Sequence, residues 1–247
     1  MTIAKKIQKD VSAFPDGFVF SISDFDCDYS QRDAAGRSLQ RMAERGEISK
    51  LSNGKYYKPR QSVFGPLLPS PSQITKEFLT KDGKVIGYLT GASAFSQLSL
   101  TTQISSNIQI GTNTYRRPLK RGAYTISFVL QPNKITKESI ELFKILDSLR
   151  FIKDVPAATP SEVCRRLIYI IKELTMTQIR SMAEFSLGYT PYVRAMLGAI
   201  LELIGAPIDI INLIRESLSG ITKYRIPISE SVLPTKSNWR IYEPTRK

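Results

Sequence analysis

The residues whose types and spacing best suit a chemical role lie between Ser30 and Lys58, and that chemistry is contact with DNA. Arginine can donate to a guanine edge and glutamine can pair with an adenine edge, so both types on one helix suit the major groove. A serine hydroxyl can donate to a phosphate. The helix predicted over residues 30–45 carries such groups on the face that cannot belong to its core: Ser30, Gln31, Arg32, Arg37, Gln40 and Arg41.

A basic hairpin follows this helix. Asn53-Gly54 is a strong signal for a tight turn, and it separates strands predicted over residues 48–51 and 55–58. Lysine side chains beside such a turn can hold the DNA backbone, with an aromatic ring at the wing. The contacts predicted from the hairpin are Lys50, Asn53, Lys55 and Tyr56.

Two further helices are needed to position these groups. Ile3, Ile7 and Val11 recur at helical spacing and predict a helix over residues 2–14. Ser23 can cap a short second helix over residues 24–27, and Gly46 can end the third. Three helices followed by a hairpin is the order of a winged helix-turn-helix.

The third helix also allows a simpler interpretation. Ala35, Leu39 and Met42 form its core stripe, and its other face could be an ordinary solvated surface. Asp33 and Glu44 on that face weaken its basic character.

The rest of the chain divides by composition. Four prolines and several serines predict a linker over residues 61–75, which separates a DNA-binding domain over 1–60 from a second domain over 76–247. Residues 76–155 show short strands and an amphipathic helix over 136–150. From residue 159 the chain turns helical, with capping boxes that begin at Thr159 and Thr175. The predicted class is α+β, with a winged helix-turn-helix first, then a mixed α/β segment and a helical C-terminal part.

A basic turn in the second domain is a further candidate for anion binding. It contains Arg116, Arg117, Lys120 and Arg121, and a solvated hairpin explains it equally well.

The amino-acid composition excludes several kinds of catalytic and metal site. The chain has no histidine and only two cysteines, which removes histidine-dependent nucleophiles and structural zinc sites. Asp24, Asp26 and Asp28 resemble a calcium loop, but Tyr29 stands where such a loop needs glycine. We therefore expect a protein without enzymatic activity, metal or cofactor.

A net charge of +13 favours a polyanionic partner. The N-terminus has no apolar leader and no apolar run could span a bilayer, so we expect a cytoplasmic protein.

Four segments together resemble the AbiEi antitoxins of bacterial AbiE toxin–antitoxin systems, in particular a Bacteroides-type branch. They are SLQRMAERGEISKLSNGKYY, VIGYLTGASAFSQLSLTTQ, IQIGTN and LFKILDSLRFIKDVP, and the resemblance covers roughly residues 1–156. It implies a winged-helix domain that binds an operator inverted repeat upstream of its own operon and represses it. The DNA-contacting role would fall on residues 30–45 and on the turn at Asn53 and Gly54.

The resemblance also implies a second role. The later domain would antagonise a nucleotidyltransferase-like toxin, in a type IV system in which the two proteins need not touch. The resemblance is weaker in the C-terminal helices. The protein could pair as a homodimer on an inverted repeat. Two alternatives stay open: a protein-interaction module and a plain transcriptional regulator without a toxin partner. An enzyme acting on nucleotides or RNA has no supporting motif.

Overall fold

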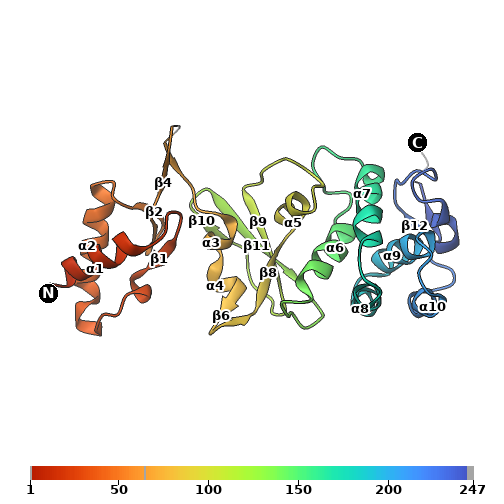
Figure 1. The fold of residues 1–247 in the computed structure, drawn as a ribbon, viewed down its shortest axis with the longest axis horizontal. Helices are drawn as coiled ribbons and strands as arrows, with labels where there is room; N and C mark the ends of the chain where they lie inside the picture. The colour runs from red at the N-terminus through yellow and green to blue at the C-terminus, as the bar shows by residue number, and fades with distance from the viewer. Residues whose placement is uncertain (1, 64, 244–247) are drawn as a thin grey trace. The chain divides into compact units, whose positions relative to one another are not determined.

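The computed structural model describes residues 2–63 and 65–243, and the chain divides into two compact units. The first unit contains residues 1–77 together with 118–126, and the second contains residues 78–117 and 127–247. The architecture is mixed, with α-helices and β-sheets in both halves of the chain and helices alone over most of the C-terminal part (Figure 1). No helix within the described residues is both long and apolar enough to cross a membrane.

The first unit begins with helices packed beside a small antiparallel sheet (Figure 1). The sheet order is β1-β3-β2, and Phe20 on β1 stands opposite Tyr56 on β3. Its elements along the chain are α1 (Ile3–Ala13), β1 (Val19–Ser21), the 3-10 turns η1 (Ile22–Asp24) and η2 (Tyr29–Gln31), α2 (Arg32–Glu44), β2 (Ser49–Ser52) and β3 (Lys55–Tyr57). The predicted helix over 2–14 and both predicted strands are confirmed.

The helix predicted over residues 24–27 is wrong. A single 3-10 turn, η1, takes its place. Ser21 is its N-cap residue, and the Ser21 backbone N–H donates to the Asp24 carboxylate over 2.8 Å. The chain then becomes extended at Phe25, whose ring is buried against Phe14 and Phe20. Burial of this aromatic ring outweighs the local helical preference. The third helix also starts later than predicted, at Arg32, after the η2 turn.

Residues 61–75, predicted as a linker, contain regular elements. Strands β4 (Arg60–Ser62) and β5 (Gly65–Leu67) pair as a hairpin, and α3 (Pro71–Ile74) follows. Ile74 is fully buried, which shows that the proline- and serine-rich stretch carries a core residue. The backbone N–H of Val19 donates to Gln73 Oε1 over 3.3 Å, so this stretch is bonded to β1.

A hairpin from later in the chain completes the first unit. It joins β10 (Leu119–Arg121) to β11 (Tyr124–Leu130) through Gly122, which has φ +58°. A Cβ at position 122 would lie 2.8 Å from the carbonyl oxygen of Leu51, so glycine permits this turn to approach β2.

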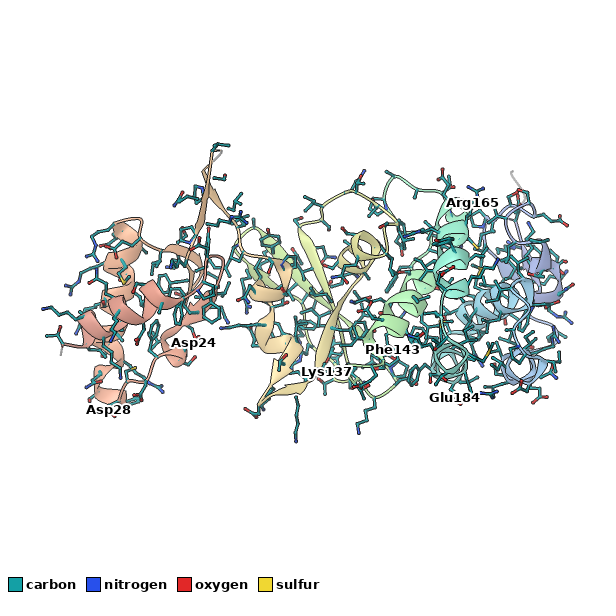
Figure 2. All side chains as sticks on the ribbon, viewed as in Figure 1. Asp24, Asp28, Lys137, Phe143, Arg165 and Glu184 are labelled. Carbon is teal, nitrogen blue, oxygen red and sulfur yellow. The ribbon has the colours of Figure 1, made fainter. Side chains whose placement is uncertain are left out.

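The second unit has a sheet with helices against it. Strands β8 (Gly87–Thr90), β9 (Asn107–Thr112) and β11 follow the order β11-β9-β8. Strands β6 (Thr80–Lys81) and β7 (Lys84–Val85) form a separate two-stranded sheet. Helices α5 (Ala92–Gln97) and α6 (Ile140–Arg150) contact this sheet. Phe143 on α6, which is labelled in Figure 2, is fully buried. The α6 helix begins four residues later than predicted, because residues 136–139 form a turn closed by Thr136 and Ser139.

The C-terminal part contains helices α7 (Pro160–Lys172), α8 (Met176–Ser186), α9 (Pro191–Leu203) and α10 (Ile208–Glu216). Helices α8 and α9 contact α6, and α10 contacts α8 and α9. Both predicted capping boxes are confirmed, since Thr159 and Thr175 exchange hydrogen bonds with Glu162 and Gln178. The tail forms β12 (Tyr224–Arg225), η3 (Pro234–Trp239) and β13 (Ile241–Tyr242). Trp239 anchors it, with its ring buried against Gly198.

Candidate nucleic-acid interface

Helix α2 presents the predicted groove-facing side chains on a rigidly held element. Ala35 and Leu39 are fully buried against the α1 side of the core. A Cβ at Gly36 would stand 3.4 Å from Ile22 Cδ1, so η1 also lies close against the helix. The backbone of α2 is therefore fixed on one side, and its opposite face is open to solvent.

The open face carries cations that the protein does not neutralise. Arg32, Arg37 and Arg41 are exposed, and none of them forms an ion pair with any residue that the structure describes. Ser30 and Gln31 are exposed just before the helix. An arginine without an internal partner keeps all its N–H donors available for a bidentate contact.

Acidic side chains near these arginines engage two other polar side chains of the predicted surface. Gln40 Nε2 donates to Glu44 Oε1 over 3.2 Å, so its amide must leave Glu44 before it can pair with a base. Arg45, near the end of α2, pairs with Glu47 at 2.5 Å. The unpaired arginines are therefore the stronger part of the predicted set.

A shallow cavity of about 300 Å³ runs beside these arginines, between α1 and α2. Its lining includes Ile3, Gln8, Arg37, Arg41 and Arg45. Arg37 and Arg41 are four residues apart on α2, so they share one side of the helix and line this cavity with cations that no described residue neutralises. Arg45 is neutralised by Glu47.

The β2–β3 turn supplies only part of the predicted contacts. Lys50 and Asn53 are exposed, as a wing contact requires. Lys55 instead pairs with Glu77 at 2.9 Å. Tyr56 is a correction to the predicted site, because its ring is buried in the core and stacks on Phe20 at 6.4 Å. Strand alternation places Tyr56 on the inner face of the sheet, so it cannot reach DNA.

The predicted basic turn does not act as one cluster. Arg121 is buried, pairs with Glu77 at 2.7 Å and also donates to the carbonyl of Ile74. Arg116 lies over the Phe78 ring at 5.5 Å, and Arg117 and Lys120 are exposed. Arg116 and Arg117 belong to the second unit, whereas Lys120 and Arg121 belong to the first.

Glu77 is the acceptor on which the first unit's internal cations converge. Partial burial raises the pKa of its carboxyl, but hydrogen bonds from Arg121 and Lys55 outweigh burial and hold the pKa below its usual range. Its carboxylate therefore links α4 (Lys76–Leu79) to β3 and β10.

One exposed aromatic residue was absent from the predicted site. Tyr29 is 87% exposed in η2, and the Arg32 guanidinium lies 5.7 Å from the centre of its ring. The pair stands at the start of α2, where helix-turn-helix proteins meet base edges. The sequence feature that could have identified Tyr29 is its position as an aromatic residue directly before a helix with several arginines.

A buried polar cluster in the second unit was also not predicted. Asp147 on α6 is 1% exposed and accepts hydrogen bonds from the hydroxyls of Tyr88, Thr90 and Tyr189 over 2.7, 2.7 and 3.0 Å. Gln131 Nε2 donates to both tyrosine oxygens, over 2.9 and 2.7 Å. Burial raises the pKa of Asp147, while the three hydroxyl donors oppose that rise. We name these five residues the Asp147 cluster; it is closed to solvent and stabilises the fold.

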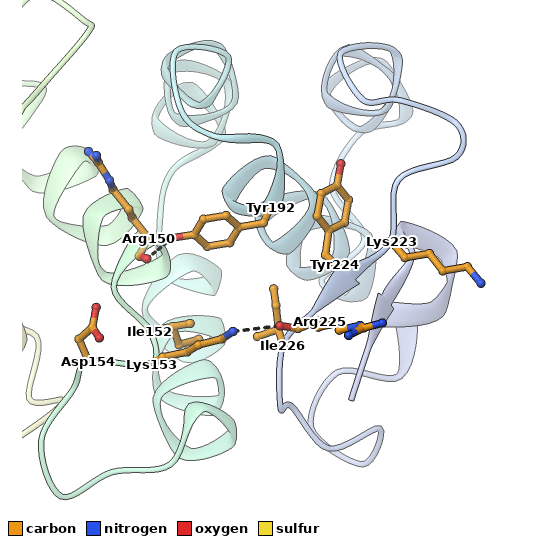
Figure 3. Close-up of a pocket in the computed structure, with 9 residues that line it drawn as sticks. All are labelled: Arg150, Ile152, Lys153, Asp154, Tyr192, Lys223, Tyr224, Arg225 and Ile226. Atoms are coloured by element: carbon orange, nitrogen blue, oxygen red, sulfur yellow. Dashed lines mark hydrogen bonds between the residues drawn. The ribbon is translucent and has the colours of Figure 1, made fainter. Parts of the chain in front are cut away.

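A cavity of about 460 Å³ in the second unit lies between the end of α6 and β12 (Figure 3). Two of its polar side chains are engaged: Lys153 Nζ donates to the Arg225 carbonyl over 3.0 Å, and the Tyr192 hydroxyl donates to the Arg150 carbonyl. The guanidinium groups of Arg150 and Arg225 point away from each other (Figure 3).

Comparisons with known proteins place the chain in a family. No curated protein matches it. Its fold is similar to the crystal structure of the RV2827C protein from Mycobacterium tuberculosis, with a TM-score of 0.50 and 13% sequence identity over 90% of this chain and 83% of that one. The model of a family of unknown function, DUF6088, matches residues 6–173. The chain therefore belongs to the DUF6088 family.

Proposed function

We propose that the first unit is a winged helix-turn-helix that binds double-stranded DNA, with α2 in the major groove and the β2–β3 turn on the backbone. The single observation that carries this proposal is that Arg32, Arg37 and Arg41 of α2 are exposed and unneutralised by described residues. Cations left without partners on a rigid helix suit an external polyanion.

The topology supports the same proposal. Helix α1, strand β1, the η turns, helix α2 and the β2–β3 hairpin follow the element order of winged helices. The sheet order β1-β3-β2 puts the hairpin turn at the free end of a sheet that packs on α1 and α2. A groove-binding helix and a wing can then reach the same duplex.

The direct test is binding to DNA upstream of the protein's own operon. Replacing Arg32 and Arg37 with alanine should weaken specific binding by about 1–3 kcal/mol for each arginine that pairs with a base. The matched control is Arg165→Ala with Lys172→Ala, which removes the same charge from exposed positions on α7 (Figure 2 shows Arg165).

Two measurements decide the result. Removal of a base-pairing arginine should reduce the preference for the upstream DNA over random duplex, whereas removal of a phosphate-binding arginine should weaken both and lower the salt slope by about one. Equal affinity and salt slope for the double variant and the parent would exclude α2 as the groove helix. No preference for the upstream DNA in the parent itself would favour a protein-interaction module.

We further propose, on the resemblance to AbiEi proteins, that the protein is an autorepressor and antitoxin. The two roles would reside in different units, because the arginines of α2 belong to the first. The Arg32→Ala/Arg37→Ala variant should then lose repression of its operon but still protect cells that express a neighbouring nucleotidyltransferase-like protein. Absence of protection by the parent would leave a plain regulator.

A further inference from the structure

The hairpin of β4 and β5 projects from the first unit and takes no part in its core (Figure 1). Its base is fixed by Pro59 and Pro69, which are both buried. Every described residue between these two prolines is exposed or half-buried. We call residues 60–68 the β4–β5 arm. A two-stranded ribbon is at best marginally stable in water, so an arm held away from the core suits a role in binding.

The arm exposes apolar side chains. Val63 at its turn is 93% exposed, and Leu67 and Leu68 are 44% and 55% exposed. Pro66 is also exposed, and it stands opposite Gln61 in the strand pair. Large apolar side chains that are exposed singly are normal on a protein surface, whereas several together on one short element indicate an interaction site.

The charge around the arm indicates which kind of partner it fits. Residues 48–76 contain no aspartate or glutamate, although the chain has 22 such residues. Arg60 on the arm and Lys50 on β2 are exposed, and neither forms an ion pair with any residue that the structure describes. Unneutralised cations on a stretch without carboxylates are complementary to the phosphates of nucleic acid.

The edges of the arm argue against a further protein strand as its partner. Pro66 has no backbone N–H, so β5 cannot donate a hydrogen bond to another strand at this position. The other edge, β4, has three residues and carries the exposed Arg60. Proline, a cation and short length are the features with which proteins prevent edge strands from pairing. Duplex DNA therefore fits the arm better than a second copy of the chain does.

We propose that the β4–β5 arm enters the minor groove of the DNA that α2 binds, with Val63 as an apolar wedge between base pairs and Arg60 on the phosphates. This inference rests on the proposed DNA binding by the first unit. Proteins that bind the minor groove commonly insert an apolar side chain between base steps, which unstacks the bases and bends the duplex by about 20–90°.

The dimensions of the arm suit this position. The chain from Pro59 to Val63 can span about 13 Å, which exceeds the minor-groove depth of about 7.5 Å. Two paired strands lie about 4.8 Å apart before their side chains are added, so a groove about 6 Å wide must widen to admit them. Strand β3 has three residues, which places the base of the arm about 10 Å from the β2–β3 turn. The arm and this turn can therefore reach one duplex.

The test is the bend of a short duplex of the upstream DNA, measured by fluorescence resonance energy transfer between its ends when the full chain binds. The parent should bend this duplex by at least about 20°. Val63→Ser should lose at least half of the bend, whereas Val63→Leu should keep it because its side chain is still apolar. Arg60→Gln should lower the salt slope of binding by about one. All three variants should keep the preference for upstream DNA over random duplex, since α2 supplies the base contacts.

Matched controls come from the second unit. Ile221→Ser alters an apolar residue that is 85% exposed, and Arg225→Gln alters an exposed arginine. The first should leave the bend unchanged, and the second should leave the salt slope unchanged.

The outcomes separate this inference from the proposed function. A parent that prefers the upstream DNA but does not bend it, or a Val63→Ser variant that bends it as the parent does, would overturn the role of the arm alone. A parent without any preference for the upstream DNA would overturn both. A dimeric parent that becomes monomeric on Val63→Ser substitution, measured by light scattering without DNA, would show that the arm joins two copies and would also overturn the proposal.

Discussion

The hydroxyls of Tyr88, Thr90 and Tyr189 all end on one carboxylate, and this explains the GYLTG segment residue by residue. Tyr88 and Thr90 donate to Asp147. Gly111 leaves room for the Tyr88 ring, since a Cβ there would lie 2.3 Å from it. The polar side chains of this segment therefore serve the structure, because they are used inside the protein.

Tyr88→Phe tests this interpretation. The change removes one donor from Asp147 and leaves a Gln131 N–H without its acceptor, so the free energy of unfolding should fall by about 1–3 kcal/mol. Chemical denaturation measures it, with Tyr169→Phe as a control at a tyrosine that is 59% exposed. Equal stability of both variants would mean that the Asp147 cluster contributes nothing net.

Single residues were harder to predict than elements. Helix α1 and strands β2 and β3 follow from apolar periodicity and turn residues, and the structure has them where they were expected. The burial of Tyr56 and Arg121 did not follow, because pairing with distant partners decides it. Asp147 could not be foreseen either, since its partners come from β8, Gln131 and Tyr189, far apart in the sequence.

At the scale of elements, α4, β3 and β10 are joined by one acidic side chain. Glu77 Oε1 accepts from both Lys55 and Arg121, at 2.9 and 2.7 Å, and the Arg121 side chain is only 7% exposed. If a buried guanidinium loses its carboxylate partner, the free-energy cost of burying its charge remains, but the attraction to the carboxylate that offset this cost is lost. Loss of the Glu77 carboxylate would therefore break both ion pairs at once.

Glu77→Gln should lower the free energy of unfolding by about 1.5–3 kcal/mol at pH 7. The pKa of Glu77 is lowered in the folded state, so it binds protons less readily there than in the unfolded chain. Its contribution is therefore complete above the usual value of 4.5 and is lost as the pH falls through the folded pKa.

The difference between parent and Glu77→Gln should thus shrink steadily below pH 4.5 in acid denaturation. Glu47→Gln, which breaks the exposed pair with Arg45, should leave stability nearly unchanged at either pH. A parent–variant difference that stays constant down to about pH 2 would contradict the ion-pair account.

At the scale of the whole molecule, the first unit is discontinuous in sequence. Residues 118–126 belong to it although residues 78–117 of the second unit precede them. Within the unit, Gly122 lies beside Leu51 and Arg121 pairs with Glu77. A fragment that ends at residue 77 therefore omits part of this unit.

A fragment of residues 1–77 should unfold at a lower temperature than the same fragment joined to residues 118–126 by a flexible glycine-serine linker. The joined hairpin restores the Arg121–Glu77 pair at a high effective concentration. Circular dichroism during heating gives both midpoints. Identical midpoints would show that the hairpin adds no stability to the first unit.

The discontinuity also sets an order of events on the ribosome. Residues 78–126 must be synthesised after Glu77 before the hairpin is complete. At roughly 5–20 residues per second this takes about 2–10 s. During that interval the nascent first unit has a carboxylate without its buried guanidinium and a β2 edge without its covering turn. The rate of translation through residues 78–126 is therefore a determinant of how long this domain remains exposed to chaperones and proteases.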